Sequence, residues 1–195
     1  MTGRAERAPR GRPADERDAD LSAVRAAQED PADFDVLYRR YLDRVYGYAF
    51  YALGDHHDAE DATERTFLAA LAALPSFRDE GASFRAWLFR IARNTVSNAR
   101  RTRWRRRTEP MPDGFDHPAP DTDPAGLVAR ADETRRVLRA LADLPDERRQ
   151  VVILRFVDGL NAREIGQVLD RSPGAARVLL HRALRDLEAR LRPRA

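Results

Sequence analysis

Hydrophobic residues recur at helical spacing through the first half of the chain. Over residues 34–53 they fall every three or four positions, until Gly54 ends the pattern. A second stripe runs over residues 59–74 and stops at Pro75, and a third covers residues 83–107. Three amphipathic helices of this length are enough to close a small core. The residues expected to face inward are Phe34, Leu37, Tyr38, Tyr41, Val45, Tyr48, Ala49, Ala52, Ala59, Ala62, Thr66, Phe67, Ala70, Leu71, Leu74, Phe84, Trp87, Leu88, Ile91, Ala92, Thr95 and Ala99.

The second half of the chain also has helical spacing. One helix is expected through Leu127, Ala131, Leu138 and Leu141 until Pro145, and another from there to Gly159. No segment alternates apolar and polar residues as a half-buried strand does, and no fixed repeat is present. The pattern therefore predicts an all-α protein.

Two helix starts near the C-terminus are marked by capping residues. Asn161 with Glu164 three positions later forms a capping-box pattern, and Ser172 with Pro173 supplies an N-cap followed by proline at the first helical position. A short helix, a turn and a longer helix make the helix-turn-helix arrangement of DNA-binding proteins, with Gly166 small where the helices approach. A plain helical hairpin is the alternative. The final helix is expected to bury Ala176, Leu180, Ala183, Leu184, Leu187 and Leu191.

In this register the longer helix turns a cationic face outward. Arginine can pair with guanine in the major groove, and backbone N–H groups at a helix start suit phosphate. The residues expected to face the groove are Arg177, Val178, His181, Arg182 and Arg185, with Arg171 and Ser172 at the helix start.

Composition divides the chain into domains. Residues 108–126 are rich in proline and acid and contain no arginine, which predicts a flexible acidic linker that could span about 60 Å. Residues 1–33 are expected to be a mostly disordered tail. The chain is thus predicted to hold two small helical domains, residues 34–107 and residues 127–195.

Charge is strongly segregated along the chain. The net charge is only +3, yet residues 84–107 carry nine arginines and no acid. A solvated helix face is the usual explanation for a run of charge. Here no acid is available for i,i+4 pairing, so the segment favours a polyanionic partner, and nucleic acid in particular.

Composition also excludes several classes of protein. Absence of cysteine rules out a disulfide scaffold and a thiolate zinc site, and fits a reducing, cytoplasmic location. No run of about 18 apolar residues could span a membrane. An enzyme with a metal held by His57 and Asp61 is a weak alternative, because no second group of ligands appears. We expect no catalytic residue, metal or cofactor.

Four segments together resemble one known family. They read FDVLYRRYLDRVYGYAFYALGD, HDAEDATERTFLAALAALPSF, SFRAWLFRIARNTVSNARR and LPDERRQVVILRFVDGLNAREIGQVLDRSPGAARVLLHRAL. In combination they are similar to the extracytoplasmic-function (ECF) sigma factors, the promoter-specificity subunits of bacterial RNA polymerase. The resemblance covers both predicted domains.

The resemblance implies partners and residues for each task. It implies binding to the β′ and β subunits of core polymerase, to promoter DNA and to an anti-sigma regulator, without enzymatic activity. Core-polymerase contacts would come from Asp58, Glu60, Asp61, Glu64 and Phe67. Contacts to the −10 element would come from Phe77, Arg78, Ser83, Arg90, Arg93, Asn94, Ser97, Asn98 and Arg101. Arg163 would join the −35 contacts already named.

The chain departs from the family pattern at three places. Glu64-Arg65 stands where the family usually has glutamine-glutamate, and Val178-Leu179 replaces polar residues of the recognition helix. Asp170 occupies a turn position that is often glycine.

A rival hypothesis, a dimeric helix-turn-helix regulator of duplex DNA, explains residues 160–191 but gives the arginine-rich helix and the linker no role.

Overall fold

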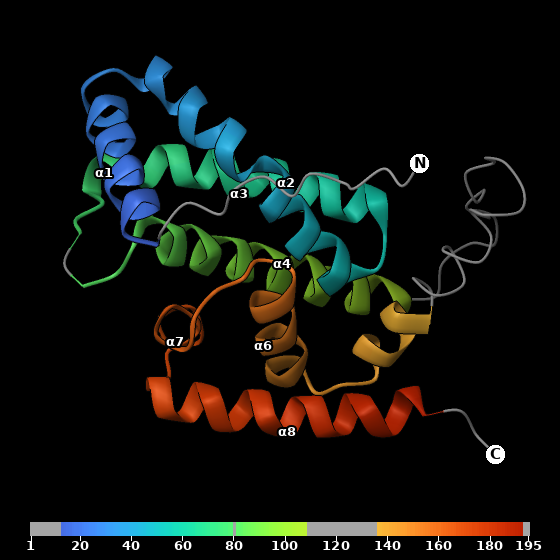
Figure 1. Cartoon of the computed structure of the whole chain (residues 1–195). Helices are drawn as coiled ribbons and strands as arrows, with labels where there is room; N and C mark the ends of the chain where they lie inside the picture. Colours follow the sequence, from blue (N-terminus) through green and yellow to red (C-terminus); the bar gives the residue numbers. More distant parts are fainter. Residues whose placement is uncertain (1–12, 80, 109–135, 193–195) are drawn as a thin grey trace, which may run out of the picture.

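The computed structural model describes residues 13–79, 81–108 and 136–192. Within these ranges, side chains are described for all residues except 13–16 and 103–108. This part of the chain is helical and contains no strand, as expected (Figure 1). The predicted linker falls outside the described residues. The α-helices are α1 (Pro13–Glu29), α2 (Phe34–Leu53), α3 (His56–Ala73), α4 (Phe84–Thr108), α6 (Asp146–Phe156), α7 (Ala162–Leu169) and α8 (Pro173–Leu191), and residues 136–142 are also helical.

The helices begin and end at residues whose chemistry favours a boundary. Gly54 ends α2 in the left-handed conformation with φ 74°, where a side chain would be strained. Asp55 caps α3 by accepting from the backbone N–H of Asp58 at 2.9 Å. Asn161 and Glu164 form the full capping box at the start of α7. The boundaries expected at Gly54 and Asn161 are therefore present.

Helix α1 occupies part of the segment expected to be disordered. It packs on the first domain through buried Val24 and Ala27. Asp20, only 4% exposed, accepts hydrogen bonds from Arg40 and, at 2.5 Å, from Tyr41. Gln28 also donates to the carbonyls of Leu74 and Phe77, so α1 is held by contacts to residues distant in the sequence, which the composition of the segment does not reveal. Residues 1–12 lie outside the described part.

The two domains pack against each other. Helices α6 and α7 lie between α4 on one side and α8 on the other (Figure 1), and α7 contacts α4 while α6 contacts α2. The hydrophobic core runs through both domains. The amphipathic pattern of each domain is complete by itself, so the pattern does not predict this contact between the domains.

Buried Arg149 hydrogen-bonds to the end of a neighbouring helix in the second domain. Its guanidinium, on a residue only 6% exposed, donates to the carbonyls of Leu141, Ala142 and Leu144 at the end of helix 136–142. Burial lowers the pKa of this group to about 10. The orphan carbonyls of a helix end are thus satisfied by one buried cation.

Candidate nucleic-acid and protein interfaces

Helices α7 and α8 form a tight helix-turn-helix. A β-carbon added at Gly166 would lie 2.5 Å from the carbonyl oxygen of Arg171, so the turn passes directly against α7. Asp170 takes the left-handed conformation at the end of α7, with φ 55°. The Ser172 side chain accepts from the N–H of Ala175 at 3.1 Å and Pro173 follows it. The close approach expected at Gly166 is therefore present.

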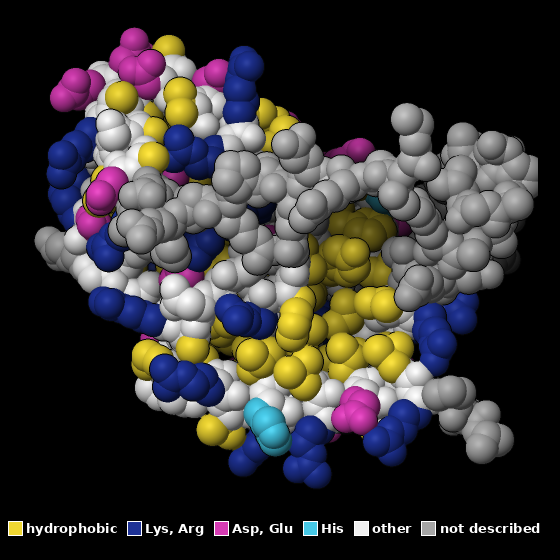
Figure 2. Space-filling model, in the orientation of Figure 1, with side chains coloured by type: hydrophobic (Ala, Val, Ile, Leu, Met, Phe, Trp, Pro, Cys, Tyr) yellow, Lys and Arg dark blue, Asp and Glu magenta, His cyan; other side chains and the backbone are white. Residues whose placement is uncertain are grey.

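The outer face of α8 is open to solvent. Figure 2 shows arginine side chains along the edge of the molecule that α8 forms. Val178 is 52% exposed, although apolar. An apolar side chain on a groove-reading face can contact a thymine methyl group. The exposed members of the expected −35 set are Arg163, Arg171, Ser172, Arg177, Val178, His181, Arg182 and Arg185.

Arg171 already has an acidic partner. Its guanidinium pairs with Glu147 of α6 at 2.8 Å, and the side chain remains half exposed. Exposed ion pairs of this kind contribute little to stability. The pair holds the arginine beside the start of α8, where a phosphate could compete for it.

The predicted −10 residues divide into an exposed row and a partly covered row on α4. Arg90, Asn94, Asn98 and Arg101 are exposed. Arg93 and Ser97 are half-buried, and Arg93 donates to Gln150 of α6 at 2.8 Å. These side chains, Arg90 excepted, line one broad hollow along α4. The helix thus presents amide and guanidinium groups in the combination that nucleic acid contacts require.

The segment before α4 differs from its expected role at one residue. Phe77 is only 6% exposed and packs on Phe84 and Trp87, with ring centroids 5.8 and 5.1 Å away. Its ring therefore supports the segment from inside instead of meeting a base. Arg78 is exposed, and Ser83 caps α4 by accepting from the N–H of Ala86 at 3.2 Å.

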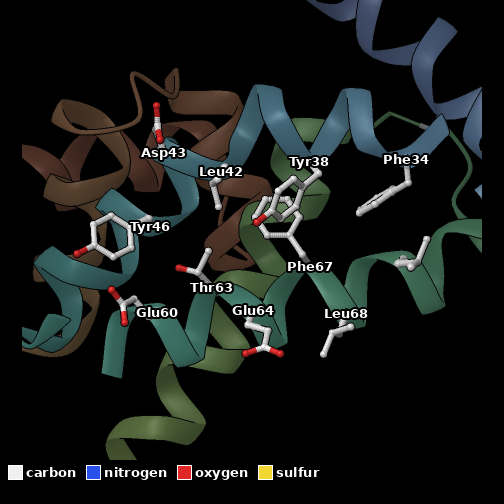
Figure 3. A pocket seen from close by; sticks show the side chains of 11 residues that line it. Phe34, Tyr38, Leu42, Asp43, Tyr46, Glu60, Thr63, Glu64, Phe67 and Leu68 are labelled. Atoms are coloured by element: carbon white, nitrogen blue, oxygen red, sulfur yellow. The ribbon is translucent and has the colours of Figure 1, made fainter. Parts of the chain in front are cut away.

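A groove of about 540 Å³ lies between α2 and α3 (Figure 3). Aromatic and aliphatic side chains form its floor, and Phe67 meets Tyr38 edge-on with centroids 4.8 Å apart. Glu60 and Glu64 stand at its α3 edge. An apolar groove with an acidic rim fits a basic amphipathic helix. The lining residues are Phe34, Tyr38, Leu42, Asp43, Tyr46, Glu60, Thr63, Glu64, Phe67, Leu68 and Leu71.

The groove includes residues that sequence reasoning missed or placed in the core. Leu68 is 58% exposed, and Leu71 and Tyr38, expected to face inward, are exposed as well. Leu68 and Leu71 lie three positions apart on α3, so this helix carries exposed apolar residues beside its buried stripe, and Tyr38 faces them from α2. The width of the apolar face of α3 is the feature of the sequence that could have identified these groove residues.

The expected acidic residues of α3 have different surroundings. Glu60, Asp61 and Glu64 are exposed, whereas Asp58 is half-buried in the first turn. Asp61 pairs with Arg65 at 2.8 Å, so the arginine that departs from the family pattern neutralises an acid of its own helix. Phe67 is 5% exposed and lines the groove.

The hypothesis of a metal site near His57 has no structural support. His56 instead stacks on Phe50, with centroids 4.4 Å apart, and its Nδ1 lies 2.5 Å from the Tyr46 hydroxyl. Across the described ranges, no three His, Cys, Asp or Glu side chains gather closely enough to hold a metal ion. None of the described helices is long and apolar enough to cross a membrane.

Comparison with known proteins finds one family match in each half of the chain. Residues 37–106 match Sigma-70 region 2, and residues 134–187 match Sigma-70, region 4. The ECF RNA polymerase sigma factor BldN of Streptomyces coelicolor is 35% identical over 174 residues, covering 89% of this chain. The chain spans 66% of BldN, slightly less than two thirds. The ECF RNA polymerase sigma factor ShbA of Streptomyces griseus is 36% identical over 154 residues, covering 77% of this chain and 78% of ShbA.

A solved structure has the same fold. The structure of CnrH in complex with the cytosolic domain of CnrY superposes with a TM-score of 0.68 and 26% identity. The match covers 88% of this chain and 96% of the other, so it includes both helical domains.

Proposed function

Because the chain belongs to the ECF RNA polymerase sigma factors, we propose that it directs promoter-specific transcription initiation as a subunit of bacterial RNA polymerase. It would act in the cytoplasm, on nucleoid DNA, and would perform no chemistry itself. The observation that carries the proposal is that one chain exposes two different surfaces for nucleic acid, on α8 and α4, and a third surface suited to a helical protein partner.

Helix α8 would read the −35 element as duplex DNA. Its exposed Arg177, His181 and Arg182 lie on one face, and Val178 between them offers an apolar contact. Arg171 and Arg163 flank the helix start and would hold phosphates, which fix the register of the helix without reading sequence.

We expect Arg177→Ala to lower −35-dependent transcription about five- to 150-fold, because a lost bidentate contact to guanine is worth about 1–3 kcal/mol. Binding to core polymerase should persist, since α8 lies beyond α4, α6 and α7 from the α2–α3 groove (Figure 1) and lines none of it. The measurements are run-off transcription and capture on immobilised core. Arg39→Ala is the matched control, because it removes one exposed arginine from the other domain. Equal loss of transcription and core binding would contradict the role given to Arg177.

Helix α4 would bind the −10 element. Asn94 and Asn98 can hydrogen-bond base edges, and Arg90 and Arg101 can hold the strand backbone. The segment from Arg78 to Ser83 would receive a base taken out of the stack, which costs a few kcal/mol and needs charge and a pocket to offset it. Phe77 would support this segment from the core.

The α2–α3 groove would bind core polymerase. Its apolar floor and the acids Glu60 and Glu64 suit a basic helical element, which we assign to the β′ subunit. The β subunit would meet the second domain. CnrH was solved with the cytosolic domain of CnrY, and by analogy an anti-sigma regulator is the proposed competitor for this surface.

The rival function is a dimeric helix-turn-helix regulator that acts without polymerase. It accounts for α7 and α8 but leaves the α2–α3 groove and the α4 row without a task. Size-exclusion chromatography with core polymerase separates the two hypotheses. A sigma factor co-elutes with core and binds free duplex weakly, whereas a regulator binds a palindromic duplex as a dimer and ignores core.

A further inference from the structure

The leading end of α8 presents small and apolar residues to solvent. In its first two turns the exposed residues without a polar side chain are Pro173, Gly174, Ala175 and Val178. Arg177 is the one exposed residue of these turns that has a polar side chain. The N-terminal residues of a recognition helix are the ones that contact base edges. This end of α8 can therefore form few hydrogen bonds to bases and must recognise them in another way.

Val178 has little part in holding the second domain together. It is 52% exposed, whereas Ala176 and Ala183 of the same helix are buried. Valine is also a poorer helix former than alanine, leucine or arginine. In a helix its χ1 has one strongly preferred rotamer, so its two methyl groups are held in place before anything binds. The side chain is thus a rigid apolar contact that the folded chain does not itself use.

The surface around Val178 suits DNA better than an apolar protein surface. Arg177, His181 and Arg182 are exposed beside it, and arginine side chains follow the edge of the molecule that α8 forms (Figure 2). Residues 171–185 contain four arginines and no acid. A protein that covered Val178 would also have to bury these charges, whereas DNA neutralises them with phosphates at the edges of the groove. DNA is therefore the partner that fits this face.

Thymine has the apolar group that a valine can recognise in the major groove. The bases display hydrogen-bond donors and acceptors there, and thymine adds its C5-methyl group. An apolar side chain gains by covering this methyl group, because both leave water. Over a donor or acceptor it would instead remove water without replacing its hydrogen bond, which is unfavourable. Val178 thus favours thymine and disfavours the polar edges of the other bases.

We propose that Val178 selects thymine in the −35 element, within about two base pairs of the guanine that Arg177 reads. The inference rests on the proposed function and adds a base preference to it. Cα atoms of consecutive residues are about 3.8 Å apart, close to the spacing of about 3.4 Å between base pairs. The two neighbouring residues therefore meet neighbouring or nearly neighbouring pairs.

Selection from promoters with a randomised −35 element measures this preference. Promoters retained by core polymerase with the chain are recovered and sequenced, and we expect a guanine with a thymine close to it. With Val178→Ala the guanine should remain, while the preference for thymine falls about fourfold, as expected for one buried methyl group. Val36→Ala is the matched control, because Val36 is a valine of similar exposure, 49%, on α2.

Deoxyuridine isolates the methyl group, because it keeps the hydrogen-bonding groups of thymine and lacks only the C5-methyl. In place of the selected thymine it should weaken promoter binding by the parent about fourfold and leave binding by Val178→Ala unchanged. Deoxyuridine at a thymine upstream of the element is the control for the template. Alanine is the best helix former, so the variant keeps α8, and circular dichroism verifies this.

Three results would overturn the proposal. The parent could bind both DNAs equally, in which case the methyl group is not read. Deoxyuridine could weaken the parent and Val178→Ala equally, in which case another residue reads it. Val178→Ala could lose binding to core polymerase in the absence of DNA, in which case the valine meets a protein.

Failure of the proposed function gives a different result. If the chain retains no −35 element with core polymerase that is competent with another sigma factor, it is not a promoter-specificity subunit. The selection is then repeated with the free chain and random duplex DNA, where α8 should show the same preference for thymine and the same effect of deoxyuridine. Absence of both overturns the role of Val178 as well.

Discussion

Gly166→Ala is expected to destabilise the second domain by about 3 kcal/mol, near the upper end of what overpacking costs. The added β-carbon would lie 2.5 Å from the carbonyl oxygen of Arg171, which belongs to the backbone of the turn and cannot rotate away. Either α7 and α8 move apart or the turn loses its geometry, and both displace the exposed face of α8. Transcription that depends on the −35 element should therefore be lost with the stability.

Urea unfolding followed by circular dichroism measures the effect. Gly174→Ala is the matched control, because its added β-carbon meets nothing closer than Ser172 Oγ at 3.9 Å, and it should leave stability within about 1 kcal/mol of the parent. An unfolding midpoint for Gly166→Ala equal to that of Gly174→Ala would show that the helices are not in this close contact.

Leu68→Glu is expected to weaken binding to core polymerase at least about 30-fold, equivalent to about 2 kcal/mol. Leu68 is 58% exposed and lines the α2–α3 groove, so it adds little to the stability of the free chain. In a complex a glutamate there would be buried against apolar surface without a partner. The measurement is equilibrium binding of labelled chain to core.

Val36→Glu is the control for this substitution. Val36 is 49% exposed on α2 but does not line the groove, so the same gain of charge should leave core binding within about threefold of the parent. Leu68→Met keeps an apolar side chain of similar volume and should also bind well. Equal affinities for Leu68→Glu and Val36→Glu would mean that core polymerase binds elsewhere.

Local chemistry made the helices predictable. Gly54, Asn161 and Ser172 act on the few residues next to them, so their effect on a helix boundary does not depend on the rest of the fold. The same is true of Gly166, because a short helix and a tight turn leave no room for a side chain. Each of these features depends only on residues within about ten positions of it in the sequence.

Long-range contacts were not predictable in this way. Helix α1 is fixed by Asp20 meeting Arg40 and Tyr41, and the domain contact by Arg85 meeting Glu164 almost eighty residues later. The sequence pattern around a charged residue does not indicate which distant residue will form an ion pair with it. The family resemblance places Phe77 at the DNA, and only its packing on Phe84 and Trp87 reveals that it is buried in the core.

The α2–α3 groove shows which site residues the hydrophobic pattern can predict and which it cannot. The family resemblance supplied Phe67 and the acids Glu60 and Glu64, whereas the hydrophobic pattern assigned Tyr38, Phe67 and Leu71 to the interior. An apolar stripe wider than the core requires is the mark of a helix with two partners. Which apolar residues face the second partner becomes clear only when α2 and α3 are packed together.

Mapping of transcript 5′ ends tests the central claim most directly. Genomic DNA is transcribed by core polymerase alone, with the chain, and with its Arg177→Ala variant. We expect the chain to create new start sites that share two upstream elements at constant spacing, and the variant to lose them. If the chain creates no start sites with active core, yet alone protects a palindromic duplex, it is not a promoter-specificity subunit.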